Sequence, residues 1–570
     1  MLAVNVLAVL ASVLPLVLTD DLPYLKLIPS YGEVYDYKFE IGKPAQNVSL
    51  RLDIGSGDIW IPNLADFPNC TTEVVSQSHT RTIASTETAS GCPSNGLYDI
   101  ELSKSGHYFN QSSQLTINAS YVNGNESDIQ VNQTYLNYIE IFGNYVEDEV
   151  TFKDDSGASY KLPDFVFVSA NDSNVYSGGL GLGAPSGSST SFLKAMVEEG
   201  YINSSSYSLS LNGINASYAE LILGGLDSDR FIGPLVEFDY IPILDTGETF
   251  GFAWSNDYPV IPLTGLGVTS SSGKSLTFSR SFTDGFTSGS YPRPALLDSR
   301  LLYSFLPYST LIEIAVQVNA YYSSDLDTWL VNCNVSRTGF LDFHFGNLTV
   351  MIPLVELLYE AYDNNNTLLR FQNGDTACSL AILPDYYTGY TVLGTPFLRS
   401  IYMAVDVDSR KIAMGQANPA FISKAASEEL TTTSLVGFGN STARSHTRSA
   451  IDPDASSIPF AVPNNVTSYS SLTLTVTNDY TSSGMTASSA SASTALISNG
   501  EVIIGGGKSQ SSSNISASAA SDVSGSYSKS SKAIGSSLAL GKTHVFGGLA
   551  SSTLWQIGCG VVFVYMVLIL

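Results

Sequence analysis

The chain is long, acidic and unlike a nucleic-acid-binding protein. Its 570 residues exceed what one core of ordinary size organises, so we expect two packed lobes with appended segments. The formal net charge of -26 argues against a nucleic-acid partner, because phosphate binding needs clustered Lys and Arg. An acidic surface suits work outside the cell at low pH, although solubility alone also explains it.

The N-terminus predicts export. Residues 1–19 are predicted to be a signal peptide, because an apolar run is followed at once by Asp20 and Asp21. The run lacks a Lys or Arg at its start, so a signal anchor is the alternative. Residues 20–30 would be a short leader. Fifteen N-x-S/T sequons support secretion and predict glycosylation, among them those at Asn47, Asn110, Asn118, Asn125, Asn132, Asn203, Asn215, Asn347 and Asn365.

Residues 31–418 have the pattern of a mostly β body. Short alternating runs such as EVYDYKFEIG and NVSLRLDI are broken by Gly, Asn and Ser. Helical periodicity is scarce, and the best candidates are residues 191–200 and 309–322.

A strand-aspartate-turn pattern occurs twice in this body. Asp53 ends an apolar run in RLDIGSGDIW, and Asp298 does the same in ALLDSRLLYSFLP. Each is followed well downstream by an apolar-glycine run, GGLGLG at 178–183 and TVLGTPFL at 391–398. A lone aspartate in a turn is usually a turn former. The repetition instead predicts two related β lobes, residues 31–235 and 236–418, with the two aspartates at their interface.

The body resembles the pepsin-like aspartic proteases, and with its C-terminal segments the yapsin-type branch of fungi that carries a glycosylphosphatidylinositol (GPI) anchor. YGEVYDYKFEIGKPAQNVSLRLDIGSGDIWIP resembles the family's first strands and active-site turn, and EEGYINSSSYSLSLNG, AELILGGLDSDRFIG and TVLGTPFLRSIYMAVDVDSRKIAMGQA follow in the family's order. The resemblance implies a bilobal fold with a central cleft for extended peptide or protein substrates. It also implies a catalytic pair, Asp53 and Asp298, that shares a proton and activates a water without cofactor or covalent intermediate.

The resemblance assigns supporting roles too. Ser56 is expected to bond the outer oxygen of Asp53, and Ser299 to keep the hydroxyl of the second turn. Trp60 is expected to hydrogen-bond the tyrosine of a flap hairpin, which is Tyr135 with Tyr138 as the alternative.

Three positions depart from the family's turns and would modulate activity. Ile54 replaces a threonine whose hydroxyl braces the opposite turn. Arg300 stands where the family has glycine, and Leu301 where a hydroxyl residue is usual. The guanidinium of Arg300 either approaches the carboxyl pair and favours its ionised form, or points along the cleft.

The cysteines predict local disulfides in an exported chain. Cys70 with Cys92 and Cys333 with Cys378 would each close a local loop, which leaves Cys559 over. The five histidines are scattered without ligand spacing, so no metal site is expected.

The C-terminal part predicts a surface anchor. Residues 419–553 are rich in Ser, Thr, Ala and Gly, which predicts a disordered, O-glycosylated stalk. Residues 554–570 are apolar and uncharged without a basic flank, so a GPI-anchor signal is favoured over a spanning helix.

Three functions remain open. The chain is predicted to be a monomeric, cell-surface aspartic endopeptidase, tethered to the membrane through its anchor, that acts on cell-wall or secreted proteins. The alternatives are a catalytically impaired pseudoprotease that binds extended peptides, and a structural cell-wall glycoprotein.

Overall fold

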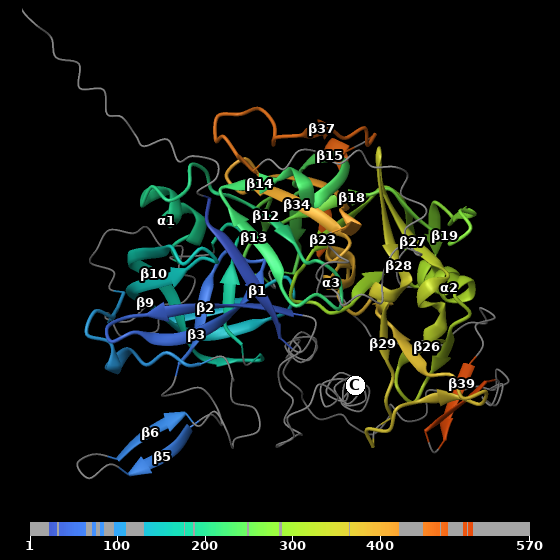
Figure 1. The fold of residues 1–570 in the computed structure, drawn as a ribbon, viewed down its shortest axis with the longest axis horizontal. Helices are drawn as coiled ribbons and strands as arrows, with labels where there is room; N and C mark the ends of the chain where they lie inside the picture. Colours follow the sequence, from blue (N-terminus) through green and yellow to red (C-terminus); the bar gives the residue numbers. More distant parts are fainter. Residues whose placement is uncertain are drawn as a thin grey trace, which may run out of the picture.

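The body is built mostly of β-strands, as the alternating sequence predicted. The computed structural model describes residues 22–30, 34–63, 71–75, 80–84, 96–109, 130–175, 177–185, 189–247, 250–283, 288–363, 365–420, 448–467, 469–476, 494–498 and 500–504. Figure 1 shows one group of strands around β1–β3 and β10 at the left, and a second around β19, β27 and β28 at the right. Strands β12, β13, β15 and β34 lie between these groups.

The largest sheet within the described residues joins the N-terminal half to the end of the body. Its strands, in spatial order, are β37 (Ala461–Pro463), β15 (Phe231–Asp239), β35 (Lys411–Ala417), β34 (Ile401–Asp406), β12 (Ser206–Ser210), β13 (Ala219–Leu223), β1 (Tyr24–Ser30), β2 (Val34–Ile41), β3 (Gln46–Asp53), β11 (Gly179–Gly181), β4 (Ile59–Pro62), β10 (Ser159–Ser173), β9 (Glu140–Lys153) and β7 (His107–Tyr108), with β8 (Gln130–Thr134) beside β9. The boundary expected between residues 235 and 236 therefore falls inside a strand of this sheet.

The C-terminal half divides its strands among smaller sheets. One contains β18 (Val260–Leu263), β23 (Arg293–Leu297), β33 (Thr391–Leu393), β24 (Ser304–Leu306) and β32 (Ile382–Pro384), and another contains β20 (Ser275–Thr277), β19 (Gly265–Ser270), β27 (Gly339–Phe345) and β28 (Leu348–Pro353). A third contains β29 (Leu358–Glu360), β31 (Ala377–Leu380), β26 (Thr328–Asn332), β25 (Tyr321–Ser323), β39 (Thr494–Ser498), β40 (Glu501–Ile504) and β30 (Arg370–Phe371).

The remaining strands form small ribbons, and the helices are short. The ribbons are β17 (Trp254–Ser255) with β16 (Ile243–Asp245) and β38 (Leu474–Val476), β14 (Gly225–Asp227) with β36 (Arg448–Ala450), β21 (Ser281–Thr283) with β22 (Ser288–Ser290), and β5 (Thr71–Val75) with β6 (Thr80–Ala84). Helices α1 (Phe192–Glu198) and α2 (Tyr308–Gln317) occupy the two stretches whose periodicity predicted helix. Helix α3 (Thr395–Leu398) was not predicted, because four residues carry no periodic signal.

The two halves repeat one local topology around their aspartates. In the first half β11 pairs in parallel with β3 and antiparallel with β4, which places Gly181 beside Asp53. In the second half β33 pairs in parallel with β23 and antiparallel with β24, which places Leu393 beside Leu297, the residue before Asp298. The apolar-glycine runs are therefore the strands that flank the aspartate turns, which explains why the two patterns recur together.

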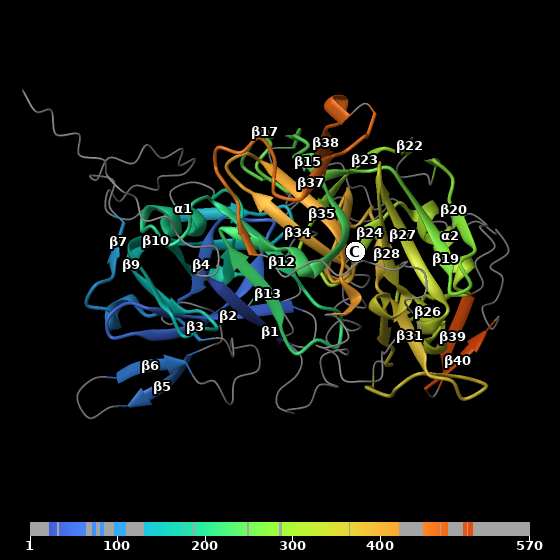
Figure 2. The same cartoon turned by 45° about the horizontal axis from the view of Figure 1, so that its top comes forward.

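Parts of the segment after the body lie on the body. Strand β36 pairs with β14, β37 with β15, β38 with β16, and β39 with β25. Figures 1 and 2 show two of these strands at separated places, with β37 beside β15 and β39 near β26. The expectation of a disordered stalk over 419–553 thus does not hold for these described strands, because a few apolar residues within the polar composition, such as Leu474 and Val476, are buried against the body. The other residues of that segment lie outside the described ranges.

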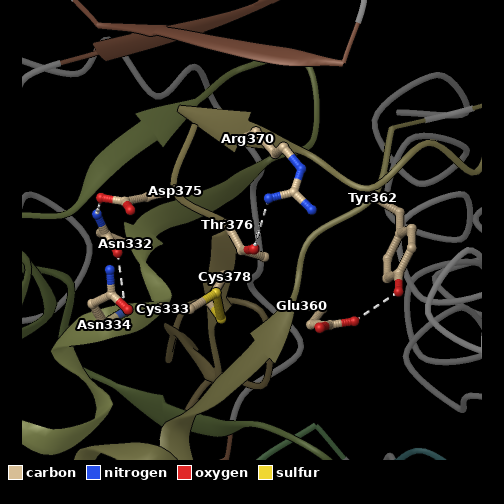
Figure 3. Close-up of a disulfide and its surroundings, with 9 residues drawn as sticks. All are labelled: Asn332, Cys333, Asn334, Glu360, Tyr362, Arg370, Asp375, Thr376 and Cys378. Carbon is tan, nitrogen blue, oxygen red and sulfur yellow. Dashed lines mark hydrogen bonds between the residues drawn. A yellow bond between two sulfur atoms is a disulfide. The ribbon is translucent and has the colours of Figure 1, made fainter. Parts of the chain in front are cut away.

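Cys333 and Cys378 form the disulfide that their positions predicted. The bond ties the end of β26 to β31 in the C-terminal half, close to Asn332 and Asp375, whose side chains are hydrogen-bonded (Figure 3). The sequons described at Asn47, Asn132, Asn203, Asn215, Asn347 and Asn365 have exposed asparagines.

Several predictions fall outside the described residues. These are the signal peptide, the C-terminal apolar tail, Cys70, Cys92, Cys559, Asn110, Asn118 and Asn125. Among the helices that the structure describes, none has the length and apolar character required to cross a membrane.

Candidate active site

The first turn presents Asp53 from the end of β3. The backbone N–H of Gly55 donates to Asp53 Oδ1 at 3.0 Å, and the N–H of Leu182 donates to the Asp53 carbonyl at 3.0 Å. Because the apolar-glycine run lies in register beside β3, Asp53 is the last residue of a strand that is paired on both sides.

The second turn presents Asp298 in the same way from the end of β23. Asp298 Oδ1 accepts hydrogen bonds from the backbone N–H of Arg300 at 2.7 Å and of Leu301 at 3.2 Å. The N–H of Asp298 donates to the carbonyl of Leu393 at 3.1 Å. The carboxyl orientation is therefore fixed by the turn itself.

Ser299 braces the two turns against each other. Its hydroxyl donates to the carbonyl of Leu52 at 2.9 Å and accepts from the N–H of Ile54 at 3.1 Å. Ile54 is buried in the main apolar core and has no hydroxyl with which to make the reciprocal bonds. The structure therefore contains one of the two cross-turn braces that paired hydroxyl residues would make, as the sequence indicated.

The two carboxyls face the same small space. A Cβ added to Gly55 would lie 3.1 Å from Asp298 Oδ2 and 3.6 Å from Asp53 Oδ1, so both carboxyls border this glycine and a side chain there would be tightly packed. Asp53 is 1% exposed and Asp298 is 0% exposed. Asp298 Oδ2 is buried without a hydrogen-bond partner among the described protein atoms. Such a pair is poised to hold a proton or a polar ligand atom.

The surroundings of the two carboxyls give them different pKa values. Burial, followed by the negative charge of Asp53, raises the pKa of Asp298 to about 7. Burial also raises the pKa of Asp53, but the nearby guanidinium of Arg300 opposes this rise. A neutral Asp298 beside an ionised Asp53 is therefore the favoured state of the pair in mild acid.

Arg300 points across to the N-terminal half, which settles the orientation that the sequence left open. Its Nη2 donates to the carbonyl of Ser177 at 3.0 Å, and its Nη1 lies 3.8 Å from Asp53 Oδ2. The guanidinium carbon lies 5.6 Å from the centre of the Trp60 ring. A Cβ added to Gly179 would come within 2.6 Å of Trp60 Nε1 and 3.2 Å of Arg300 Nη1, so glycine is needed beneath this stack. Burial lowers the pKa of Arg300 to about 10, and the side chain therefore stays cationic in acid.

A hairpin made by β8 and β9 covers the carboxyl pair. We call residues 130–141 the flap. Its tip is a tight turn in which the N–H of Tyr138 donates to the carbonyl of Tyr135 at 2.8 Å. Tyr135 shares a buried cluster with Trp60, but its hydroxyl donates to Asp58 Oδ2 at 2.7 Å. The flap tyrosine thus has a carboxylate acceptor where an indole partner was expected.

Asn137, at the flap tip, lies close enough to the carboxyl pair for its side-chain amide to lower the pKa of both Asp53 and Asp298. Its own oxygen accepts from the N–H of Ile139 at 3.3 Å, so the amide nitrogen remains to act as donor. Asn137 and Asp58 were missed by sequence reasoning. Asp58 is in the quoted first-turn motif and Asn137 is two residues after the proposed flap tyrosine, but only the folded hairpin brings them together.

Two further predicted residues have contacts that differ from expectation. The Ser56 hydroxyl was expected to bond to Asp53. In the described structure it instead accepts from the N–H of Asp58 at 3.2 Å. Leu301, at a position where a hydroxyl was usual, packs in an apolar cluster with Leu136 and Tyr138 of the flap tip. Of the residues expected at the catalytic turns, Ile54, Ser299 and Arg300 also lie beside Asp53 and Asp298, and Trp60 lies beside Arg300.

Comparison with known proteins agrees with this architecture. Residues 34–417 match the sequence model of a family described as eukaryotic aspartyl protease. Aspartic proteinase yapsin-7 of Saccharomyces cerevisiae is 40% identical over 238 residues, which cover 40% of this chain and 38% of that protein. Aspartic proteinase 3 of the same yeast is 26% identical over 69% of this chain and 71% of its own length. A probable aspartic-type endopeptidase OPSB of Arthroderma benhamiae is 26% identical over 67% of this chain and 68% of that protein.

Proposed function

Because the chain belongs to the eukaryotic aspartyl protease family, we propose that it hydrolyses peptide bonds with Asp53, Asp298 and an activated water. The observation that carries the proposal is the meeting of two buried carboxyls at one small space, each held by its own turn. Like charges in such a space cannot both ionise at little cost, so one proton is retained by the pair.

The division of labour follows from the surroundings of each carboxyl. Asp53, beside the cation of Arg300, is the ionised member and takes a proton from the attacking water as general base. Asp298, whose pKa burial raises to about 7, is the protonated member and donates to the oxygen of the scissile carbonyl. The water oxygen bonds to the carbonyl carbon to give a tetrahedral species. Asp53 then gives its proton to the leaving nitrogen as the C–N bond breaks, and a hydroxyl proton of that species returns to Asp298.

We also propose that the enzyme acts at the cell surface on cell-wall or secreted proteins. The support is in the sequence: an apolar N-terminal run, fifteen sequons and an uncharged apolar tail that suits a GPI signal. The exposure of every described asparagine among the sequons named above is compatible with glycosylation.

The test of the hydrolytic proposal is peptide cleavage by the purified chain. A mixed peptide library is incubated between pH 3 and pH 6 with the parent, with Asp53→Asn, with Asp298→Asn and with the control Asp164→Asn. Asp164 is exposed in β10 and takes no part in the site. We expect cleavage by the parent and the control and none by the two site variants. Equal cleavage by all four would refute the assignment.

A second candidate is a protein that binds peptides without cleaving them. The observation in its favour is the buried cation 3.8 Å from Asp53, which disfavours the proton that the pair must share. If Arg300→Gly cleaves the library and the parent does not, the natural protein is such a binder. Cleavage by the parent excludes this candidate.

A further inference from the structure

The tip of the flap is bonded to the C-terminal half of the body. The hydroxyl of Tyr138 donates to the carbonyl of Thr388 at 2.8 Å. In the opposite direction, the hydroxyl of Tyr390 donates to the carbonyl of Leu136. The groups involved are buried, so both bonds are protected from competition with water.

Apolar packing accompanies these bonds. The ring of Tyr138 lies 5.5 Å from that of Phe250 in an edge-to-face arrangement, and Gln133 Nε2 donates to the Phe250 carbonyl at 3.3 Å. Leu136 and Tyr138 belong to the same buried cluster as Phe250 and Tyr390. A hairpin that belongs to the sheet of the N-terminal half is thus packed into the core of the other half.

The segment after the body supports the surface on which the flap tip docks. Strand β38 adds in parallel to β16, and the carbonyl of Val476 accepts from the N–H and the hydroxyl of Thr246 at 3.0 Å and 2.9 Å. Leu474 and Val476 are buried in the cluster that contains Leu136 and Tyr138. Residues 469–476, which we call the strap, are therefore bonded to Thr246 and packed in the same cluster as Phe250.

We infer that Tyr138 and Tyr390 form a latch that keeps the flap closed over the carboxyl pair, and that the strap braces this latch. In the latched state Asn137 lies against both carboxyls, and each carboxyl is at most 1% exposed, so an extended peptide has no access to them. The consequence of the latch for activity rests on the proposed function. If the chain is a protease, the latch must open before a substrate enters, and a substitution that weakens the packing of the strap raises activity.

The test compares full-length variants by two independent measurements. Hydrogen exchange of the flap amides, followed by mass spectrometry, reports opening whether or not the chain is an enzyme. The kcat/KM for a cleaved peptide reports access. The latch variants are Tyr138→Phe, Tyr390→Phe and their combination. The control is Tyr160→Phe, because Tyr160 is also buried but its hydroxyl donates to Asp154, and neither residue belongs to the flap or to its cluster. Each phenylalanine keeps the ring and removes the hydroxyl alone.

We expect flap exchange to accelerate about threefold to tenfold for each latch hydroxyl removed, and about tenfold to a hundredfold in the double variant. The strap is tested by Val476→Ala, with Val502→Ala as its control, since Val502 is equally buried but belongs to a different cluster. Val476→Ala should accelerate flap exchange, and Val502→Ala should not.

The outcomes separate the latch from the hydrolytic proposal. Faster flap exchange with a higher kcat/KM supports the latch and its role. If the latch variants show faster flap exchange but the parent cleaves no peptide, the latch is supported and the hydrolytic proposal is refuted. Flap exchange equal to that of Tyr160→Phe, or faster exchange with an unchanged kcat/KM in an active parent, overturns the inference.

Discussion

Replacement of Arg300 by glutamine tests how far a cation buried beside the carboxyl pair sets its working pH. Arg300 Nη1 lies 3.8 Å from Asp53 Oδ2, and both side chains are buried. At an effective dielectric constant of about 20, two unit charges at that separation interact by about 4 kcal/mol. Since each 1.4 kcal/mol is about a factor of ten, the cation favours the ionised over the protonated form of Asp53 by up to roughly a thousandfold.

The sign of the expected change follows directly. The guanidinium holds the pKa of Asp53 below the value that burial alone would set, so Asp53 stays ionised to lower pH. Without the cation, Asp53 takes up its proton at higher pH. In Arg300→Gln the acid limb of the pH profile of kcat/KM should therefore move to higher pH, because the general base is lost earlier as the pH falls.

The assay is kcat/KM for one cleaved peptide measured from pH 2.5 to pH 7.5. Arg300→Lys serves as the matched variant, since it keeps a cation and should leave the acid limb close to that of the parent. Glutamine retains donors for the Ser177 carbonyl, and a thermal melt of each variant checks that the fold survives. An acid limb at the same pH in Arg300→Gln and in the parent would refute the electrostatic reasoning.

Three further predictions concern the framework of the site. Burial raises the pKa of Asp298 to about 7 from an ordinary 3.8, so ionisation of this group lowers the unfolding free energy as the pH rises between these values, by about 4 kcal/mol in all. Asp298→Asn should therefore have a higher melting temperature than the parent at pH 7 and a smaller gain at pH 4. Equal gains at the two pH values would contradict this. Ser299→Ala leaves two buried backbone groups without their partner and should lower the unfolding free energy by about 2 to 4 kcal/mol in urea titrations, whereas Ser299→Thr should lower it far less. Replacement of Cys333 and Cys378 by alanine opens a loop with a sequence separation of 45 and should cost up to about 4 kcal/mol, so an unchanged urea midpoint would contradict the loop-entropy account.

The local patterns of the sequence predicted the elements that hold the site. Alternating runs predicted the strands, and the repeated aspartate turn together with the repeated apolar-glycine run indicated a duplicated topology. Pairing of β11 with β3 and of β33 with β23 shows the physical link, since each glycine-containing strand must lie close beside an aspartate turn. The disulfide between Cys333 and Cys378 could be predicted because its two cysteines lie near each other in the sequence of one half.

Contacts between distant segments could not be predicted in this way. The polar composition after residue 419 predicted a disordered stalk, yet β36, β37 and β38 add to strands of the body, because a few apolar residues suffice when a sheet edge offers hydrogen bonds. Likewise the rotamer of Arg300 depends on the carbonyls of residues 177 and 178, which precede it by more than a hundred positions.

The sequence by itself determined the strand-rich body, the aspartate turns and the chemistry available to them, because these depend on residue type and short-range spacing. Only the tertiary structure decided that Asn137 meets both carboxyls, that Tyr135 bonds to Asp58, and that Tyr138 and Tyr390 join the flap to the opposite half. Such contacts depend on how two sheets close on each other, and periodicity within one strand carries no information about that closure.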